Sequence, residues 1–325
     1  MKPFISSLLL LSLLPLLLSC GGGKKPVAPE TYEPQAPAFC EDSAYAYVAA
    51  QCAFGPRTMN SAAHEACGNW IAQKFKDFGA TIHDQYADAK LHDGTAVRLR
   101  NIIASIHPDA ETRILVSAHW DSRPWADNEE DEGLHHTPID GANDGASGVA
   151  VMLELARQFS IAQEPTCALG IDFICWDAED SGTHGEGSTT TWCLGSQYWA
   201  GKRHVEGYTA RYGVNLDMVG GSKIIFCKEG LSLRYAPAIV DRIWNLAQRL
   251  GYGHYFKNDP CGEMVDDHLP VNQGGIPCVD IIGLDAEMGG FPDTWHTLND
   301  NLAHINKATL KAVGQTMLEL LWTEE

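Results

Sequence analysis

Cationic side chains are scarce in this sequence. Its 325 residues include 23 Lys and Arg against 42 Asp and Glu, which gives a formal net charge of −19. This excess argues against nucleic acid or an anionic lipid surface as a partner, because both carry negative charge themselves. A well-solvated surface is the simplest explanation for the composition.

Beyond residue 38 the chain has no internal repeat, no low-complexity run and no break in composition. Nothing there suggests a boundary between two domains. The remaining length suits one α/β domain of roughly 250 to 300 residues. We therefore expect a single folded domain over residues 39–325.

The sequence also lacks a Cys-x-x-Cys pair, the spacing typical of a thiolate metal site. It has ten cysteines, and nine without Cys20. An odd number leaves at least one thiol unpaired or paired between chains, even in an oxidising compartment. Cys175 and Cys278 occur in apolar, strand-like stretches, so we expect them to be small buried hydrophobic side chains. The spacing does not predict which cysteines pair.

The first residues have the features of a targeting segment. Lys2 precedes an apolar run from Leu8 to Leu18, which is too short to span a bilayer as a helix. The sequence Leu-Leu-Ser-Cys-Gly that follows, at residues 17–21, is typical of a bacterial lipoprotein cleavage box. We therefore predict a lipoprotein signal peptide at residues 1–19, with a plain secretory signal as the alternative.

Cleavage at this box would leave Cys20 as the first residue, with lipid on its sulfur. Residues 20–38, rich in Gly, Pro and Lys, would form a flexible tether. We expect a lipid-anchored protein of the bacterial periplasm, on the outer membrane, whose only membrane contact is the anchor. The sequence sets neither its orientation there nor its oligomeric state, for which we take a monomer as the expectation.

Short apolar runs alternate with amphipathic patterns along the chain. Five runs bounded by turn signals are typical of buried strands: Val97–Ile106, Arg113–Ala118, Leu169–Trp176, Tyr212–Met218 and Pro277–Ile282. Four amphipathic patterns predict helices: Ser61–Phe78, Gly148–Phe159, Tyr235–Leu250 and Lys307–Leu321. This alternation predicts an α/β fold with a central mixed, mainly parallel sheet and helices on both faces.

Ligand-type side chains come at the ends of three predicted strands: His119 and Asp121, Glu179 and Asp180, and Asp217. Functional groups of such sheets collect just past the carboxyl ends of the strands. We therefore expect these side chains to lie at one edge of the sheet.

Three segments far apart in the chain contain candidate zinc ligands: Asp144 in IDGANDGAS, Asp180 in WDAED and His296 in FPDTWH. Two carboxylates and one imidazole leave the fourth tetrahedral position open, as a catalytic zinc site requires. Taken singly, each of these residues has a commoner role. An Asp before a helix, for example, is more often an N-cap. Together with the segments of His119 and Asp217, five segments place ligand-type residues at one sheet edge. This coincidence favours a metal site, with Glu179 placed for proton transfer beside it.

Taken in order, these residues resemble those of the co-catalytic zinc aminopeptidases and of the related zinc-dependent glutaminyl cyclases, from about Tyr45 to the C-terminus. In the aminopeptidases, the positions matching His119, Asp144 and Asp217 hold one zinc ion. The positions matching Asp144, Asp180 and His296 hold another, and in the cyclases only this second set binds metal. The resemblance implies a zinc aminopeptidase-like fold.

Two local segments favour the cyclases. Residues 266–270 (DDHLP) resemble a DDH-x-P segment of the cyclases, where the aminopeptidases usually have Ser at the first position. Residues 291–297 (FPDTWHT) resemble the cyclase FPxxWHT segment. The site roles that the resemblance implies are proton transfer by Glu179 with Asp217 and Asp266, and an apolar substrate pocket walled by Trp295, Phe291 and, by position alone, Trp192.

The activity that the resemblance implies is that of a glutaminyl-peptide cyclotransferase, which converts the N-terminal Gln of peptides and proteins to pyroglutamate and releases ammonia. One zinc ion per chain is expected. Asp180 stands where the animal cyclases have Glu, and its shorter side chain can still ligate zinc. Two alternatives stay open: a two-zinc aminopeptidase or dipeptidase, with His119 as a ligand, and a zinc-holding lipoprotein without catalytic activity.

Overall fold

A computed structural model describes residues 32–162, 169–185, 188–287 and 289–324. The predicted signal peptide, the predicted lipidation site Cys20 and most of the predicted tether lie outside the described residues. Contacts group the chain from Glu33 onward into one compact unit. Within the described ranges, no helix has the length and apolarity needed to cross a membrane.

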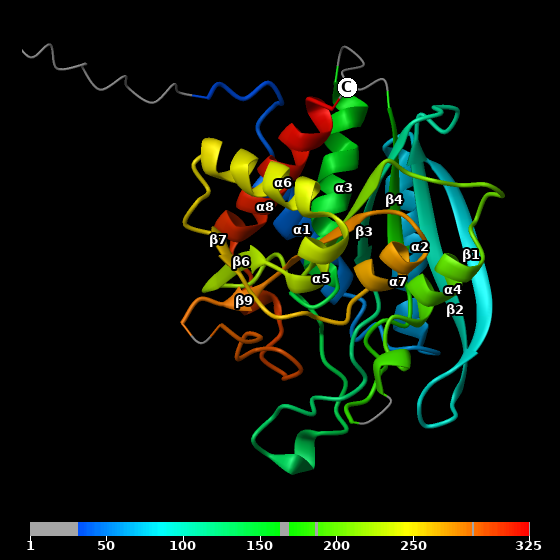
Figure 1. The fold of residues 1–325 in the computed structure, drawn as a ribbon. Coiled ribbons are helices and arrows are strands. Elements are labelled where there is room, and N and C mark those ends of the chain that lie inside the picture. Colours follow the sequence, from blue (N-terminus) through cyan, green and yellow to red (C-terminus); the bar gives the residue numbers. More distant parts are fainter. Residues whose placement is uncertain (1–31, 163–168, 186–187, 288, 325) are drawn as a thin grey trace, which may run out of the picture. The chain divides into compact units, whose positions relative to one another are not determined.

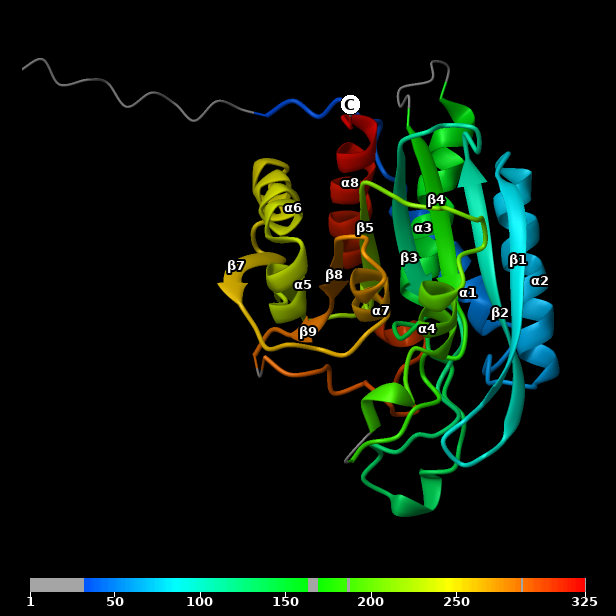
Figure 2. The same ribbon diagram turned by 45° about the vertical axis from the view of Figure 1, so that its right-hand side comes forward.

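Six strands form the central sheet in the order β1-β2-β4-β3-β5-β8, which Figure 2 shows from right to left. Their bounds are β1 Thr81–Lys90, β2 Ala96–Ile106, β3 Arg113–His119, β4 Gly170–Trp176, β5 Tyr212–Asp217 and β8 Cys278–Ile282. β3 pairs in parallel with β4 and β5, and β5 with β8. β2 pairs antiparallel with β1 and β4. The predicted mixed, mainly parallel sheet is confirmed.

Helices cover both faces of this sheet (Figure 1). α3 (Ala146–Ile161) packs on β3 and β5, whereas α4 (Leu194–Gly201) packs on β2 and α7 (His268–Gln273) on β5 and β8. In β3, Ala118 faces α3, while Leu115 joins a cluster with Val271 of α7. Residues three apart on a strand point to opposite faces, so α3 and α7 lie on opposite sides.

Five further helices complete the described fold: α1 Glu41–Cys52, α2 Ala62–Asp77, α5 Gly230–Tyr235, α6 Pro237–Arg249 and α8 Lys307–Trp322. α1 and α8 pack beside α3, and α2 packs on β1 and β2. All four predicted helices appear, as α2, α3, α6 and α8, with bounds that differ from the expected ones by at most two residues. Pro237 begins α6 and disfavours helical backbone at Ala236, which separates α6 from the short α5, a helix that was not predicted.

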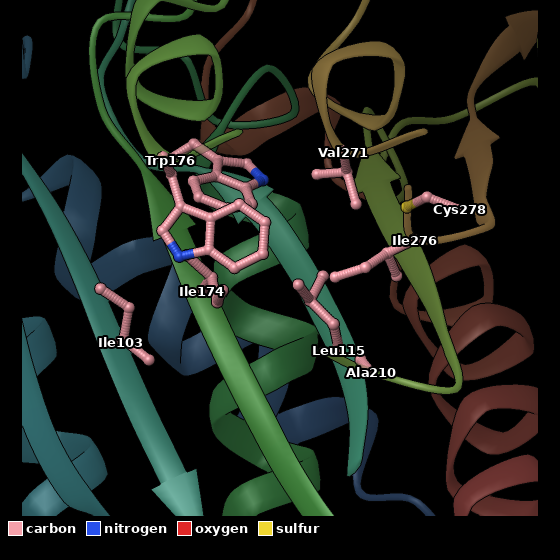
Figure 3. Close-up of a cluster of buried hydrophobic side chains, with 9 residues drawn as sticks. Ile103, Leu115, Ile174, Trp176, Ala210, Val271, Ile276 and Cys278 are labelled. Carbon is pink, nitrogen blue, oxygen red and sulfur yellow. The ribbon is translucent and has the colours of Figure 1, made fainter. Parts of the chain in front are cut away.

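A cluster of buried apolar side chains fills the face beneath α4 and α7 (Figure 3). Trp176 at the end of β4 meets Trp199 of α4 edge to face, with ring centroids 5.3 Å apart. Burying a large apolar side chain contributes about 1.5 to 3 kcal/mol, so the cluster holds the end of β4 firmly. Cys278 belongs to this cluster and Cys175 is also fully buried, as expected.

A second, three-stranded sheet was not predicted from the sequence. Its order is β7-β6-β9, with β6 Ile224–Lys228, β7 Phe256–Pro260 and β9 Leu284–Asp285. A disulfide between Cys227 and Cys261 joins β6 to the residue that follows β7. It therefore anchors the chain just before the segment that carries Asp266.

Candidate active site

A pocket with a volume of about 320 Å³ opens beyond the carboxyl ends of β4 and β5. All nine residues predicted to form the site line it: Asp144, Glu179, Asp180, Trp192, Asp217, Asp266, Phe291, Trp295 and His296. They come from segments spread over more than 150 positions of the chain. The sheet edge brings them together, as the position of functional groups in α/β folds predicts.

The three predicted zinc ligands are neighbours. Ligating atoms of Asp144, Asp180 and His296 all lie within 4.8 Å of one another, and all three residues are buried. Nε2 of His296 is 3.2 Å from Oδ1 of Asp180 and 3.7 Å from Oδ2 of Asp144. Oδ2 of Asp180 is buried and has no hydrogen-bond donor among the described residues. Such an orphaned carboxylate oxygen beside an imidazole fits a divalent cation, and the two oxygens and one nitrogen fit zinc.

Asp144 is held by Asp300. The two carboxylate oxygens of Asp300 accept the main-chain N–H groups of Asn143 at 2.7 Å and of Asp144 at 3.0 Å. Asp144 is not the N-cap of α3, because that position is Gly145, with φ of 95°. A Cβ on Gly145 would lie 2.7 Å from the main-chain oxygen of Asp121. The side chain of Asp144 is therefore free of a capping role, which supports a ligand.

Glu179 and Asp180 follow β4 in a turn that Asp121 secures. Its carboxylate accepts the main-chain N–H groups of Glu179 at 3.1 Å and of Asp180 at 3.2 Å. Arg123 adds a hydrogen bond from Nη1 to the main-chain oxygen of Asp180 at 3.1 Å. Residues that follow β3 thus position the acids that follow β4.

His296 is oriented from both sides of its ring. Nδ1 lies 3.4 Å from Oδ1 of Asp127, which leaves Nε2 toward the other candidate ligands. Burial alone would raise the pKa of Asp127, but hydrogen bonds from Arg123 and His296 lower it. An ionised carboxylate on the second ring nitrogen is the usual partner of a metal-binding histidine.

A second group of ligand-type residues shares Asp144. Ligating atoms of His119, Asp144 and Asp217 also lie within 4.8 Å of one another. Nε2 of His119 is 2.9 Å from Oδ1 of Asp144 and 3.3 Å from Oδ1 of Asp217. These are the positions that the resemblance assigns to the other zinc of the aminopeptidases. The geometry therefore fits either one or two metal ions per chain.

Two acids of the pocket, Glu179 and Asp217, have raised pKa values. Burial raises the pKa of Glu179 well above 4.5. His119 lowers it, whereas the neighbouring Asp180, Asp266 and Asp267 raise it further. Burial also raises the pKa of Asp217 to about 7, with Asp266 contributing. Confinement of several carboxylates disfavours the ionised form of each. Shared protons are therefore expected in this cluster.

Aromatic rings form one wall of the pocket. Trp295 packs on His296 with ring centroids 3.7 Å apart, and Phe291 packs on Trp295 at 4.3 Å. Trp192, which the sequence placed only by position, stacks near His296 at 6.1 Å and accepts the Arg123 guanidinium over its ring at 4.8 Å. Trp295 and Trp192 therefore lie beside the imidazole that is a candidate ligand, and Phe291 packs behind Trp295.

Backbone strain concentrates at this site. Four non-glycine residues next to or within it have positive φ: Ala178 at 53°, Cys193 at 57°, Met218 at 49° and His296 at 56°. Such conformations cost free energy and persist where the surrounding structure imposes them, often at functional sites. Neither this strain nor the positioning roles of Asp127 and Asp300 were predicted from the sequence, since none of them has a recognisable motif.

The chain is similar to proteins of one family. The model of peptidase family M28 matches residues 101–321. A solved glutaminyl cyclase from Bacteroides thetaiotaomicron, bound to N-acetylhistamine, has 51% identity and a TM-score of 0.86, covering 90% of this chain and 100% of that one. A Zn-dependent exopeptidase from Parabacteroides distasonis has 49% identity and a TM-score of 0.85, covering 89% of this chain and 100% of that one.

More distant relatives extend the likeness. A glutaminyl-peptide cyclotransferase from Gloydius blomhoffii is 26% identical over 242 residues, which cover 67% of this chain and 63% of the relative. The chain thus spans somewhat less than two thirds of that curated relative. The expected zinc aminopeptidase-like fold is confirmed by these likenesses, and the zinc-dependent relatives agree with zinc as the metal.

Proposed function

The chain belongs to peptidase family M28, and we propose that within it the protein acts as a glutaminyl-peptide cyclotransferase. Its substrates are peptides and proteins with N-terminal Gln, which it converts to pyroglutamate with release of ammonia. The observation that carries the proposal is the position of Asp266, whose carboxylate lies within 4.8 Å of Glu179 in the pocket. The resemblance places an acid here in the cyclases and usually Ser in the aminopeptidases. Solved relatives named as glutaminyl cyclases support the same activity.

Asp144, Asp180 and His296 are the residues that would hold one zinc ion per chain. When bound, the zinc supplies a Lewis acid that polarises the γ-carbonyl of the substrate glutamine. The substrate needs no attacking water, because its own α-amine is tethered near that carbonyl. We prefer one zinc ion at these three residues over two ions, because residues 266–270 follow the cyclase pattern.

Glu179 moves the proton of the reaction. The α-amine nitrogen forms a bond to the γ-carbonyl carbon while the bond from that carbon to the amide nitrogen breaks. Glu179 takes one proton from the α-amine and returns it to the departing nitrogen, so pyroglutamate and ammonia are the only products. A carboxyl group whose pKa is raised by burial suits this double role, because it binds the amine proton more tightly than an exposed carboxylate would.

Asp217 and Asp266 support Glu179 by sharing protons with it. Nδ2 of Asn215 donates to Oδ2 of Asp266 at 3.1 Å, and the main-chain N–H of Asp267 donates to the other oxygen. These bonds fix how Asp266 faces the pocket. Oδ1 of Asp217 lies 3.3 Å from Nε2 of His119. The three acids therefore form one network around the position of the substrate amine.

Trp295, Phe291 and Trp192 bind the glutamine side chain. Aromatic walls with a few placed polar groups are the usual composition of small-molecule pockets. They also exclude water, which would otherwise compete with the α-amine. A closed aromatic wall therefore favours cyclisation over hydrolysis.

The direct test is incubation of purified protein with a Gln-initiated peptide, followed by mass spectrometry. Loss of ammonia from the intact peptide, with no free amino acid, is the expected result. A control peptide with Asn in place of Gln has the wrong ring size and should not react. Release of free N-terminal residues from either peptide would contradict the proposal.

A zinc exopeptidase is the second candidate, favoured by the shared position of Asp144 between the two ligand groups. It predicts two zinc ions per chain and free amino acids as products. A catalytically silent zinc-holding protein predicts zinc with neither product. The peptide assay and a zinc measurement together separate the three.

We also propose that lipid on Cys20 attaches the mature chain to the outer membrane. This proposal rests on the sequence at residues 17–21. Labelling of the protein with a radioactive fatty acid in a bacterial host tests it. The Cys20→Ala variant should lose the label. A labelled Cys20→Ala protein would show that the lipid is attached elsewhere.

A further inference from the structure

The start of α4 is bound to the turn that carries Glu179. Three successive main-chain N–H groups of one segment donate to three successive carbonyls of the other: Cys193 to Glu179 at 3.0 Å, Leu194 to Ala178 at 3.1 Å and Gly195 to Asp177 at 2.9 Å. This antiparallel pairing holds Cys193 directly opposite Glu179. A Cβ on Gly195 would lie 2.4 Å from the main-chain oxygen of Asp177, so the two segments approach more closely than a side chain at position 195 would allow.

The Cys193 side chain contacts Glu179 as well. Sγ lies 3.4 Å from Oε1 of Glu179, within hydrogen-bond distance for sulfur, and both groups are buried. The ligating atoms of these two residues and of Asp266 lie within 4.8 Å of one another. The thiol is therefore part of the acid cluster and not of an apolar core.

Two observations show that the thiol serves this contact and no local one. Cys193 has φ of 57° and ψ of 35°, a left-handed conformation that glycine adopts without cost. Cys193 is also the N-cap of α4, yet its side chain makes no capping hydrogen bond. A strained non-glycine residue whose side chain does not cap its helix points to another use of that side chain.

The thiol stays protonated in this environment. Burial raises the pKa of Cys193 well above its ordinary value, and the neighbouring Glu179, Asp267 and Asp266 add to the effect. Toward an ionised carboxylate, a protonated thiol acts as a hydrogen-bond donor. It is not a nucleophile, since reactive cysteines are thiolates in electropositive surroundings.

We propose that Cys193 is a positioning residue for proton transfer. Its S–H binds Oε1 of Glu179 and so leaves Oε2, which lies 4.0 Å from Nδ1 of His119, to face the reacting amine. The inference rests on the proposed role of Glu179 as the proton-transfer group. It adds a hydrogen-bond donor outside the nine residues predicted from the sequence.

Three substitutions at one position test the proposal. Cys193→Ser keeps a donor, Cys193→Ala removes it and retains the backbone strain, and Cys193→Gly removes it and relieves the strain. The readouts are kcat and KM for a Gln-initiated peptide, with zinc content and thermal unfolding as controls. Cys193→Gly keeps the test valid if Cys193→Ala does not fold.

We expect kcat to fall about tenfold in Cys193→Ala and Cys193→Gly, equivalent to about 1.4 kcal/mol, with KM and zinc content unchanged. Cys193→Ser should stay within about threefold of the wild type in kcat, as a charge-assisted hydrogen bond is retained. Equal losses in all three variants would show a packing role, and wild-type kcat in Cys193→Ala or Cys193→Gly would remove the role altogether. If the wild type released amino acids instead of ammonia, the proposed function would fail, while the same variants, assayed on that reaction, would still test Cys193.

Discussion

Arg123 donates from Nη1 to Oδ1 of Asp180 at 3.2 Å, and both side chains are almost fully buried. The same guanidinium forms two hydrogen bonds to Asp127, at 2.7 and 2.6 Å. Asp127 in turn lies 3.4 Å from Nδ1 of His296. One buried cation therefore orients two of the three proposed zinc ligands.

Replacement of this cation should weaken metal binding. We expect Arg123→Met to lower zinc affinity about ten- to hundredfold, because partners behind the ligands fix their orientation. Competition with a chromogenic chelator measures the affinity. The zinc affinity of Arg123→Lys should lie between those of the wild type and of Arg123→Met, since Lys keeps the charge but lacks the planar guanidinium. Zinc affinity equal to the wild type in Arg123→Met would show that the ligands need no such support.

Removal of the proton-transfer group should separate activity from metal binding. Glu179→Gln is expected to lower kcat by about 10² to 10⁴-fold while zinc content stays that of the wild type, because the amide occupies the same space without accepting a proton. Steady-state kinetics and metal analysis check this. The exposed Asp293, in the segment of His296, provides the control Asp293→Asn, which should keep full activity. Full activity in Glu179→Gln would mean that another group moves the proton.

Metal removal should distinguish the two zinc counts. Chelation is expected to abolish cyclisation, and titration with zinc should restore it with saturation near one equivalent per chain. His296→Ala should lose zinc, whereas His119→Ala should retain one zinc, since His119 belongs only to the second ligand group. Saturation near two equivalents, together with loss of half the zinc in His119→Ala, would instead support the exopeptidase.

The buried carboxylate of Glu229 should make the stability of the fold depend on pH. Burial alone would raise the pKa of Glu229, but His268 and the main-chain N–H groups of Leu231 and Ser232 lower it from 4.5 to about 2. A depressed pKa stabilises the fold above about pH 4.5, and this contribution is lost as pH falls from there to about 2.

The lowered pKa of Glu229 corresponds to about 3 kcal/mol of folding stability at neutral pH. Urea unfolding should show a loss of this order in Glu229→Gln at pH 7, and a smaller difference from the wild type at pH 3. The exposed Asp259 at the end of β7 offers the control Asp259→Asn, expected within about 0.5 kcal/mol of the wild type. A loss independent of pH would show that Glu229 acts by packing alone.

Strands and candidate ligands were predictable because each leaves a local pattern. The apolar runs that became β2 to β5 and β8 need no tertiary information, since burial on both faces demands an unbroken apolar sequence. The acids at the ends of β3, β4 and β5 were then placed at one edge by the rule for parallel sheets. The edge strand β1 escaped prediction because half-exposed positions interrupt its apolar pattern.

Contacts between loops were not predictable in the same way. Trp192 was assigned by position alone, and only the fold placed its ring beside His296. The contacts of Arg123 with Asp180, of Asp300 with Asp144 and of Cys193 with Glu179 each join residues at least 14 positions apart, through loops whose path has no periodicity to read. Their roles therefore needed the structure.

The chemistry of the site was determined by the sequence itself, because zinc accepts few kinds of ligand and their residue types are visible in Asp144, Asp180 and His296. The tertiary structure decided how those groups are oriented, through Arg123, Asp127 and Asp300, and how close Cys193 comes to Glu179. The physical reason is distance. Hydrogen bonds act over about 3 Å, a scale that chain order does not encode and that only the packed fold sets.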